Sequence, residues 1–140
     1  SIGFLIGNLL STKLNKRISL EKIVLVGITI CFTGIFIFFI LAFLNLYNEV
    51  VISIPMTVYG FGSGLVIPTA GVIAVSVDKN IVGTGSALYG FNIFIMGAIS
   101  TLFSSFIIHK NQIPVSIMMM VFVSIAVICF YFGYKNKNYN

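Results

Sequence analysis

The sequence predicts an all-α membrane protein, a polytopic bundle of helices that cross the bilayer several times. Two observations lead to this prediction. First, 59% of the 140 residues are hydrophobic and only 8% are charged, whereas a soluble domain carries about 25% charged residues. Second, the apolar residues form runs of more than twenty, and about 20 helical residues cross a bilayer core. With so little polar surface, the chain must turn apolar side chains toward lipid, so the lipid bilayer is its first expected partner.

Four apolar runs are long enough to span, and a shorter run precedes them. The full spans are expected at 22–45, 50–77, 81–108 and 113–134. As a helix, residues 1–10 reach only about 15 Å, half of a bilayer core. We therefore expect a truncated span there, and a chain that is a fragment or a shortened product of a larger protein. The runs are too long for transmembrane strands, which take about 9–11 residues.

Basic residues gather in alternate connections between these spans. The first, third and last connections hold seven of them, Lys13, Lys16, Arg17, Lys22, Lys79, Lys135 and Lys137, against Lys110 alone in the others. Cytoplasmic loops carry such an excess, which predicts a cytoplasmic C-terminus. A nucleic-acid partner is not expected despite the formal net charge of +5, because the basic residues flank apolar runs and do not interleave with aromatic ones.

Small residues in the last two-thirds of the chain indicate close approach between helices, since membrane helices pack through small side chains. Gly83, Gly90, Gly97 and Ser104 recur every seven residues. Seven residues are nearly two helical turns, so the four form one stripe. The stripe is either a fixed contact with another helix or a contact along which helices slide.

The span at 50–77 should bend. Gly60 and Gly64 form a GxxxG pair, and Pro68 follows them. Proline cannot donate to the carbonyl of the residue four positions earlier, and its ring crowds that carbonyl. The bend is either a tolerated irregularity or a gating element. Pro55 and Pro114 are expected at the starts of their helices, where proline fits well.

No Asp, Glu, Lys or Arg lies in the middle of a predicted span. Proton-coupled transport uses such titratable groups within the membrane, so we expect no proton coupling by this chain alone. The candidates for lining a substrate cavity are neutral: Ser63, Ser86, Tyr89 and Asn92. Asn92 is costly to leave in lipid, so we expect it to face the bundle interior, where it either bonds a neighbouring helix or lines the cavity.

The residue content excludes most enzyme mechanisms. His109 is the single histidine, and the chain has neither a phosphate-binding loop nor paired carboxylates. Cys31 and Cys129 lie in separate apolar runs without further metal ligands nearby, so each is expected to be a core or lipid-facing residue. We expect no enzymatic activity, no cofactor and no metal.

Three stretches carry a family resemblance. Residues 7–17 read GNLLSTKLNKR, residues 60–74 read GFGSGLVIPTAGVIA, and residues 83–90 read GTGSALYG before Gly97 and Ala98. They resemble the basic loop between helices eight and nine, helix ten, and helix eleven of a major facilitator superfamily drug transporter of the bicyclomycin-resistance (Bcr/CflA) type. By this resemblance Gly7, Lys13, Lys16 and Arg17 belong to the cytoplasmic loop motif. Ser11 stands where that motif has an acid, and Ser19 where it closes with glycine.

The resemblance implies a partial C-terminal half of such a transporter, with four full spans and one truncated span. It implies drug:proton antiport by alternating access in a bacterial cytoplasmic membrane. The partners implied for the full-length protein are a small hydrophobic drug-like substrate and protons, and the missing N-terminal half would hold the coupling carboxylates. Two other readings stay open. One is a non-transporting membrane subunit or a remnant of a decayed gene. The other is a four-helix transporter of the small multidrug-resistance type, which needs a glutamate within its first span.

Overall fold

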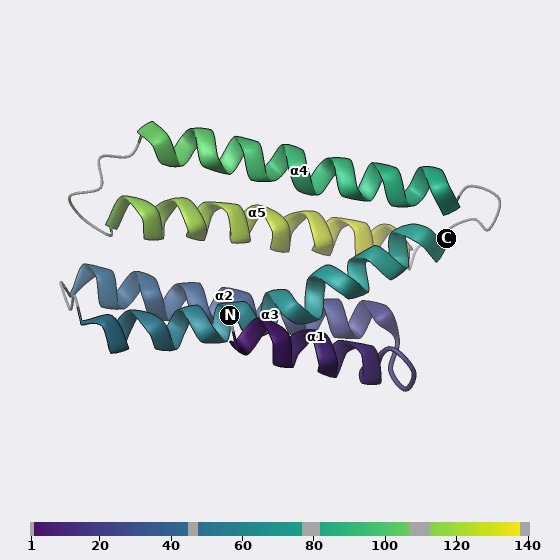
Figure 1. Cartoon of the computed structure of the whole chain (residues 1–140), viewed down its shortest axis with the longest axis horizontal. Helices are drawn as coiled ribbons and strands as arrows, with labels where there is room; N and C mark the ends of the chain where they lie inside the picture. The colour runs from purple at the N-terminus through teal and green to yellow at the C-terminus, as the bar shows by residue number, and fades with distance from the viewer. Residues whose placement is uncertain (1, 45–47, 77–81, 107–112, 138–140) are drawn as a thin grey trace.

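The described part of the chain forms a bundle of five α-helices (Figure 1). The structure, a computed structural model, describes residues 2–44, 48–76, 82–106 and 113–137. The helices are α1 (Ile2–Leu14), α2 (Leu20–Phe43), α3 (Glu49–Ser76), α4 (Val82–Phe106) and α5 (Ile113–Lys137). No strand occurs in the described ranges. The predicted all-α fold class is therefore confirmed, and α2 to α5 are each long and apolar enough to cross a membrane.

The first helix is longer than the apolar run that predicted it. The sequence placed the start of a polar connection at Ser11, but α1 continues to Leu14. Ser11 is fully buried, because its face of the helix packs on α3. The basic residue in the last turn of α1 is Lys13, and a cation at a helix C-terminus interacts favourably with the helix dipole. With 13 residues, α1 is about 20 Å long, too short to span.

Helices α1, α2 and α3 form one closely packed unit, which we call the α1–α3 unit. Helix α3 lies between the other two: Gly3 and Gly7 of α1 approach Phe61 of α3, while Gly27 and Gly34 of α2 approach α3 from another side. Helix α5 packs along α2, and the main contact of α4 is with α3. Figure 1 shows α4 at the far side of the bundle from α1.

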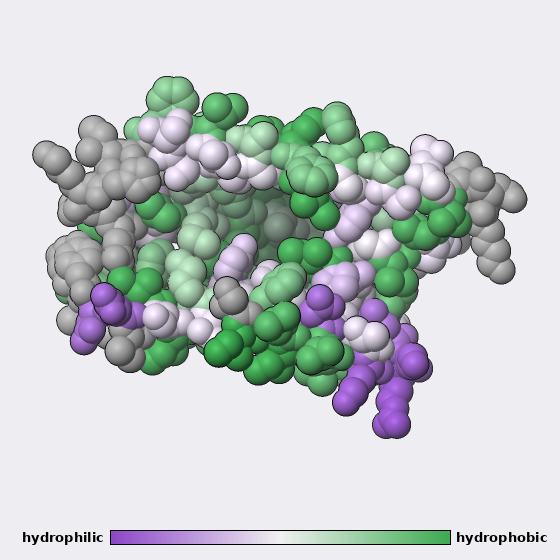
Figure 2. All heavy atoms as spheres, in the orientation of Figure 1, coloured by the Kyte–Doolittle hydropathy of each residue, from purple (hydrophilic) through white to green (hydrophobic). Residues whose placement is uncertain are grey.

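Successive helices from α2 to α5 run in opposite directions along the bundle (Figure 1). Four described basic residues, Lys13, Lys16, Arg17 and Lys22, lie at or beside the connection from α1 to α2, and we call this the basic end. Glu49 begins α3 at the opposite end. Figure 2 shows strongly hydrophilic groups at the edges of the molecule, with apolar side chains over most of the surface between them.

Helix α3 contains two prolines, Pro55 and Pro68, and Figure 1 shows it bent past its midpoint. Pro68 lies in that part of the helix, where it removes a backbone donor and crowds the preceding turn. The expectation for Pro55 was wrong: it is the seventh residue of α3 and fully buried, because the helix already begins at Glu49. Pro114 lies in the first turn of α5, as predicted.

Candidate functional site

The glycine pair of α3 packs directly on the backbone of α1. A Cβ atom at Gly64 would overlap the carbonyl oxygen of Phe4, and one at Gly7 would overlap the carbonyl oxygen of Phe61. Gly60 is looser, since its Cβ would lie 3.5 Å from the backbone nitrogen of Phe4. Such short approaches leave room only for a hydrogen atom, so the helices meet backbone to backbone, as small-residue motifs allow in membranes.

The same segment of α3 also packs on α2, through the glycine between that pair. A Cβ atom at Gly62 would lie 2.7 Å from both the Cys31 sulfur and the carbonyl oxygen of Gly27. The Cys31 thiol donates to the carbonyl oxygen of Tyr59 at 3.6 Å. Gly60 and Gly64 of α3 thus face α1, and Gly62 between them faces α2. A single GxxxG contact needs only two glycines, and the third is explained by the contact with the second helix.

A polar cluster joins α1 to α3 at the basic end. The hydroxyls of Ser11 and Thr69 lie 3.0 Å apart, and the Thr69 hydroxyl also lies 3.3 Å from Oδ1 of Asn15 and 2.7 Å from the carbonyl oxygen of Leu65. Both hydroxyls are fully buried. Buried polar groups are costly unless they are bonded, and each of these has a partner. This cluster was not predicted from the sequence, although Gly3, Gly7 and Ser11 repeat at four-residue spacing.

One side chain ties α4 to α3. The Tyr89 hydroxyl donates to the carbonyl oxygen of Ile67 at 2.5 Å, and the Tyr89 ring lies over Gly71, whose Cβ would be 3.1 Å from it. One turn earlier, a Cβ atom at Gly85 would lie 2.8 Å from the carbonyl oxygen of Ala74. The contact therefore sits on the part of α3 that includes Pro68, and it involves only the first third of α4.

The other three cavity candidates bond within their own helices. Ser63 donates to the carbonyl oxygen of Gly60 at 2.9 Å, Ser86 to that of Gly83 at 2.9 Å, and Asn92 to that of Leu88 at 2.9 Å. Ser86 and Asn92 are exposed and Ser63 is half-buried. The expected bond from Asn92 to a neighbouring helix is not formed in the described structure. The Asn92 amide instead donates to the carbonyl oxygen of Leu88 in its own helix, and the close contacts of α4 with α3 are one turn or more before it, at Gly85 and Tyr89.

Asn92 nevertheless continues the face of α4 that meets α3. Gly85, Tyr89 and Asn92 are spaced by four and then three residues, so they share one side of the helix. Asn92 therefore lies on the side of α4 on which Gly85 and Tyr89 meet α3, one turn beyond Tyr89. Figure 2 shows the molecule hollowed between α4 and the α1–α3 unit.

The glycine stripe of α4 faces open space. A Cβ atom added at Gly83, Gly90 or Gly97 would have no atom of another described helix within 4 Å. The expected close contact is therefore not made within the described chain. The reason is rotational: Gly85 and Tyr89 fix the side of α4 that meets α3, and the three glycines lie between about 80° and about 160° around the helix from them. The large side chains of this helix are also uncovered, since Phe94 is 81% and Phe91 61% exposed.

The loop-motif residues separate into two groups. Gly7 is buried within α1 and contacts α3, while Lys13, Lys16 and Arg17 lie around a depression at the basic end, together with Leu10 and Leu14. The described residues contain no group of three His, Cys, Asp or Glu side chains placed to hold a metal ion. His109 lies outside the described residues. Cys31 and Cys129 are both free.

Comparison with known proteins gives no relative. No family model matches the chain, and neither a curated protein nor a solved structure matches it. The site is therefore characterised by its own geometry: a closely packed three-helix unit, a fourth helix held to it near one end, and a hollow between them (Figure 2).

Proposed function

We propose that this chain forms part of one half of a drug:proton antiporter of the major facilitator superfamily, of the bicyclomycin-resistance type. In such transporters two bundles rock about a central cavity and expose it alternately to each side of the membrane. The three sequence stretches at 7–17, 60–74 and 83–90 support the assignment. The basic end then lies in the cytoplasm of a bacterium, because cytoplasmic ends carry the excess of Lys and Arg.

The observation that carries the proposal is the attachment of α4 at one end only. Its first third is tied to α3 through Tyr89, while most of the remaining residues are exposed, with Asn92 on the same side of the helix as Tyr89. A helix that borders a substrate cavity must be held by the bundle yet leave one face uncovered. Substrate here is a small hydrophobic molecule, bound by aromatic and neutral polar side chains.

Proton coupling requires groups that this chain does not place in its spans. The acidic residues of the described helices, Glu21 and Glu49, both lie in first turns, at the ends of the bundle. The coupling carboxylates therefore belong to a second half, which supplies the opposite wall of the cavity. The small multidrug-resistance reading requires an embedded glutamate and is disfavoured for the same reason.

Reconstitution tests the proposal directly. Vesicles containing the chain alone, with ethidium inside and an imposed pH gradient, are expected to show no gradient-driven efflux. Cells that also produce the remaining part of a bicyclomycin-resistance-type antiporter, from its first helix into helix eight, are expected to show ethidium efflux. Efflux driven by the pH gradient in vesicles that contain the chain alone would contradict the proposal that the proton-coupling carboxylates belong to another part of the transporter.

Cysteine labelling tests the cavity wall independently. In a chain whose native cysteines are replaced by serine, a water-soluble maleimide is expected to label Asn92→Cys and to spare Phe94→Cys, which lies on the opposite side of α4. Equal protection of both positions in the two-half assembly would favour the non-transporting subunit, in which Asn92 faces packed helices or lipid and no aqueous cavity forms.

A further inference from the structure

A depression at the basic end gathers three cations, and we call it the basic depression. It has a volume of about 530 Å³ and is lined by Lys13, Lys16 and Arg17 together with Leu10, Thr12 and Leu14. The three cationic side chains are exposed. Figure 2 shows the strongly hydrophilic groups of this end projecting beside apolar side chains. Charge and apolar surface therefore meet at one place on the molecule.

The cations of the basic depression exceed what the end of α1 needs. Lys13 lies in the last turn of this helix, where the helix dipole amounts to about half a negative charge. Three cations therefore leave a positive excess of about two and a half charges. None of the residues that line the depression is acidic. The acid of this end, Glu21, lies in the first turn of α2 and lines a different space, together with Ile73 and Cys129. The depression is thus a site for an anion.

An apolar stripe on α1 leads to one of these cations. Ile2, Ile6, Leu9 and Lys13 are spaced by four, three and four residues, so they share one face of the helix. The three apolar side chains are 73%, 53% and 70% exposed, because the opposite side of α1 packs on α3. The eleven residues from Ile2 to Lys13 rise about 16 Å, close to the hydrocarbon depth of one leaflet. Cations above an apolar stripe of this length match the outline of a phospholipid.

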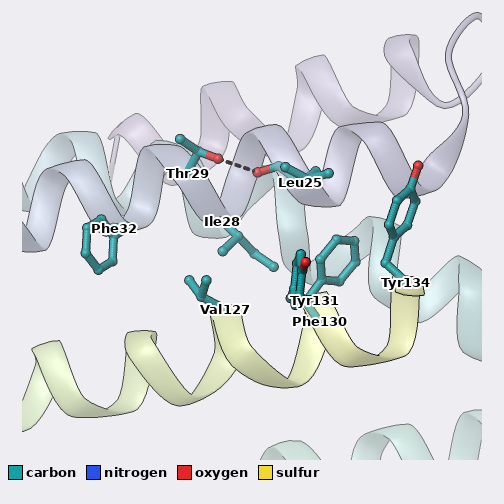
Figure 3. Close-up of a pocket in the computed structure, with 8 residues that line it drawn as sticks. All are labelled: Leu25, Ile28, Thr29, Phe32, Val127, Phe130, Tyr131 and Tyr134. Carbon is teal, nitrogen blue, oxygen red and sulfur yellow. Dashed lines mark hydrogen bonds between the residues drawn. The ribbon is translucent and has the colours of Figure 1, made fainter. Parts of the chain in front are cut away.

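The groove between α2 and α5 lacks such cations. It has a volume of about 290 Å³, and Figure 3 shows aromatic side chains of α5 reaching across toward α2, with Tyr134 at one end. None of the eight residues that line it is charged. The Thr29 hydroxyl donates to the carbonyl oxygen of Leu25 in its own helix at 2.8 Å. Filling this groove should therefore not change a preference for the charge of a headgroup, which makes the groove a control for the basic depression.

We propose that the basic depression binds the headgroup phosphate of an anionic phospholipid, whose acyl chain lies along Ile6 and Leu9. The Arg17 guanidinium offers two parallel donors to one phosphate, and the lysines add point charges. Each Lys or Arg near a membrane surface strengthens such binding about fivefold. The proposal does not depend on transport, since the depression and the stripe belong to α1 and the connection after it, away from α4.

Native mass spectrometry of the full chain in detergent micelles tests the proposal, with dioleoyl phosphatidylglycerol and dioleoyl phosphatidylcholine as probes. The unaltered chain is expected to retain the anionic lipid at least about tenfold more than the zwitterionic one. Lys13→Gln and Arg17→Gln are each expected to lower this preference about fivefold. Lys13→Arg keeps the charge and is expected to keep the preference, and circular dichroism checks that each variant remains helical.

Matched controls separate a site from the general charge of this end. Lys22→Gln makes the same charge change at the basic end but outside the depression, and is expected to leave the preference within about twofold. Val127→Phe fills the α2–α5 groove and is expected to leave it unchanged. Phosphatidylglycerol with hexanoyl chains is expected to bind at least about tenfold more weakly. Excess inorganic phosphate is not expected to displace the dioleoyl lipid, because it makes no contact with the apolar stripe.

Three results would overturn the proposal. One is equal retention of the two dioleoyl lipids by the unaltered chain. Another is an equal loss of preference in Lys22→Gln and Lys13→Gln, which would indicate the general field of the basic end. The last is displacement of the dioleoyl lipid by inorganic phosphate, which would show that the depression holds an anion without selecting a lipid.

Discussion

The α1–α3 unit and α4 are built from the same kind of sequence but pack in opposite ways. Both are apolar and rich in glycine. In the unit, Gly7, Gly62 and Gly64 have neighbouring backbone so close that no side chain fits, while in α4 Gly90 and Gly97 have nothing near among the described helices. Two spaced glycines on a membrane helix therefore indicate a face on which another helix can pack closely. Whether the contact forms depends on whether another helix lies against that face.

The difference is energetic as well as geometric. Lipid tails are as apolar as leucine, so no hydrophobic force drives helices together within the bilayer. The unit gains its cohesion from dense contact and from the bonded Ser11–Thr69 pair. Helix α4 is tied to α3 by the Tyr89 hydroxyl and by short contacts at Gly85 and Gly71. We expect substitutions in the unit to have large effects and those on α4 to have small ones.

The largest effect is expected from Gly64→Leu. The new side chain would occupy the place of the Phe4 carbonyl, so α1 must separate from α3, at a cost of about 3 kcal/mol in the free energy of unfolding. Unfolding by SDS in mixed micelles, followed by energy transfer between dyes on α1 and α3, measures it. Gly97→Leu is the matched control, with a change within about 1 kcal/mol. Equal losses would erase the contrast between the two regions.

A smaller effect is expected from Thr69→Val. It keeps the shape of the side chain but removes the hydroxyl that lies against both Ser11 and Asn15, which leaves buried polar groups without a partner. The expected loss is about 1 kcal/mol in the same unfolding assay. Thr101→Val removes an exposed hydroxyl that bonds the carbonyl oxygen of Gly97, and should change stability little. A larger loss at Thr101 than at Thr69 would contradict the assignment of the cluster.

The smallest change in stability, about 0.6 kcal/mol, is expected from Tyr89→Phe, which removes the bond to Ile67 and keeps the ring over Gly71. Its clearer signature is a broader distribution of distances between spin labels on α3 and α4, measured by pulsed electron resonance. Tyr131→Phe, 63% exposed on α5, is the control for losing a phenol. An unchanged distribution in Tyr89→Phe would show that α4 is held by other contacts.

The spans were predictable because run length and charge alone determine them. Each predicted full span lies within about two residues of α2, α3 and α4, and α5 begins where expected at Ile113. The end of α1 was not predictable in this way. Polar residues such as Ser11 and Thr12 mark a loop when they face water, but Ser11 pairs with a hydroxyl 58 positions away, and a local pattern does not contain that partner.

The candidate site was only partly predictable for the same reason. Spacing identified Gly64 as a packing residue, and the structure places it at a helix contact. Tyr89 was a candidate for lining a substrate cavity, and the structure places its hydroxyl against the backbone of α3. Spacing does not say how a helix is rotated. The α4 stripe was expected to meet a neighbour, but the contacts at Gly85 and Tyr89 fix a rotation that leaves it uncovered within the described chain. Asn92 lies on the contacting side of α4, one turn beyond Tyr89, and its amide bonds the carbonyl oxygen of Leu88 in its own helix.

The bond at Tyr89 holds α4 to α3 near one end of the helix. The helix continues for 17 residues beyond it, to Phe106, a length of about 25 Å. A tilt of about 10° about Tyr89 therefore moves the far end by about 4 Å, on the order of the diameter of a methyl group or a water molecule. Because Tyr89 bonds the carbonyl oxygen of Ile67, beside Pro68, we expect a change in the bend of α3 to displace the far end of α4 more than the end held at Tyr89.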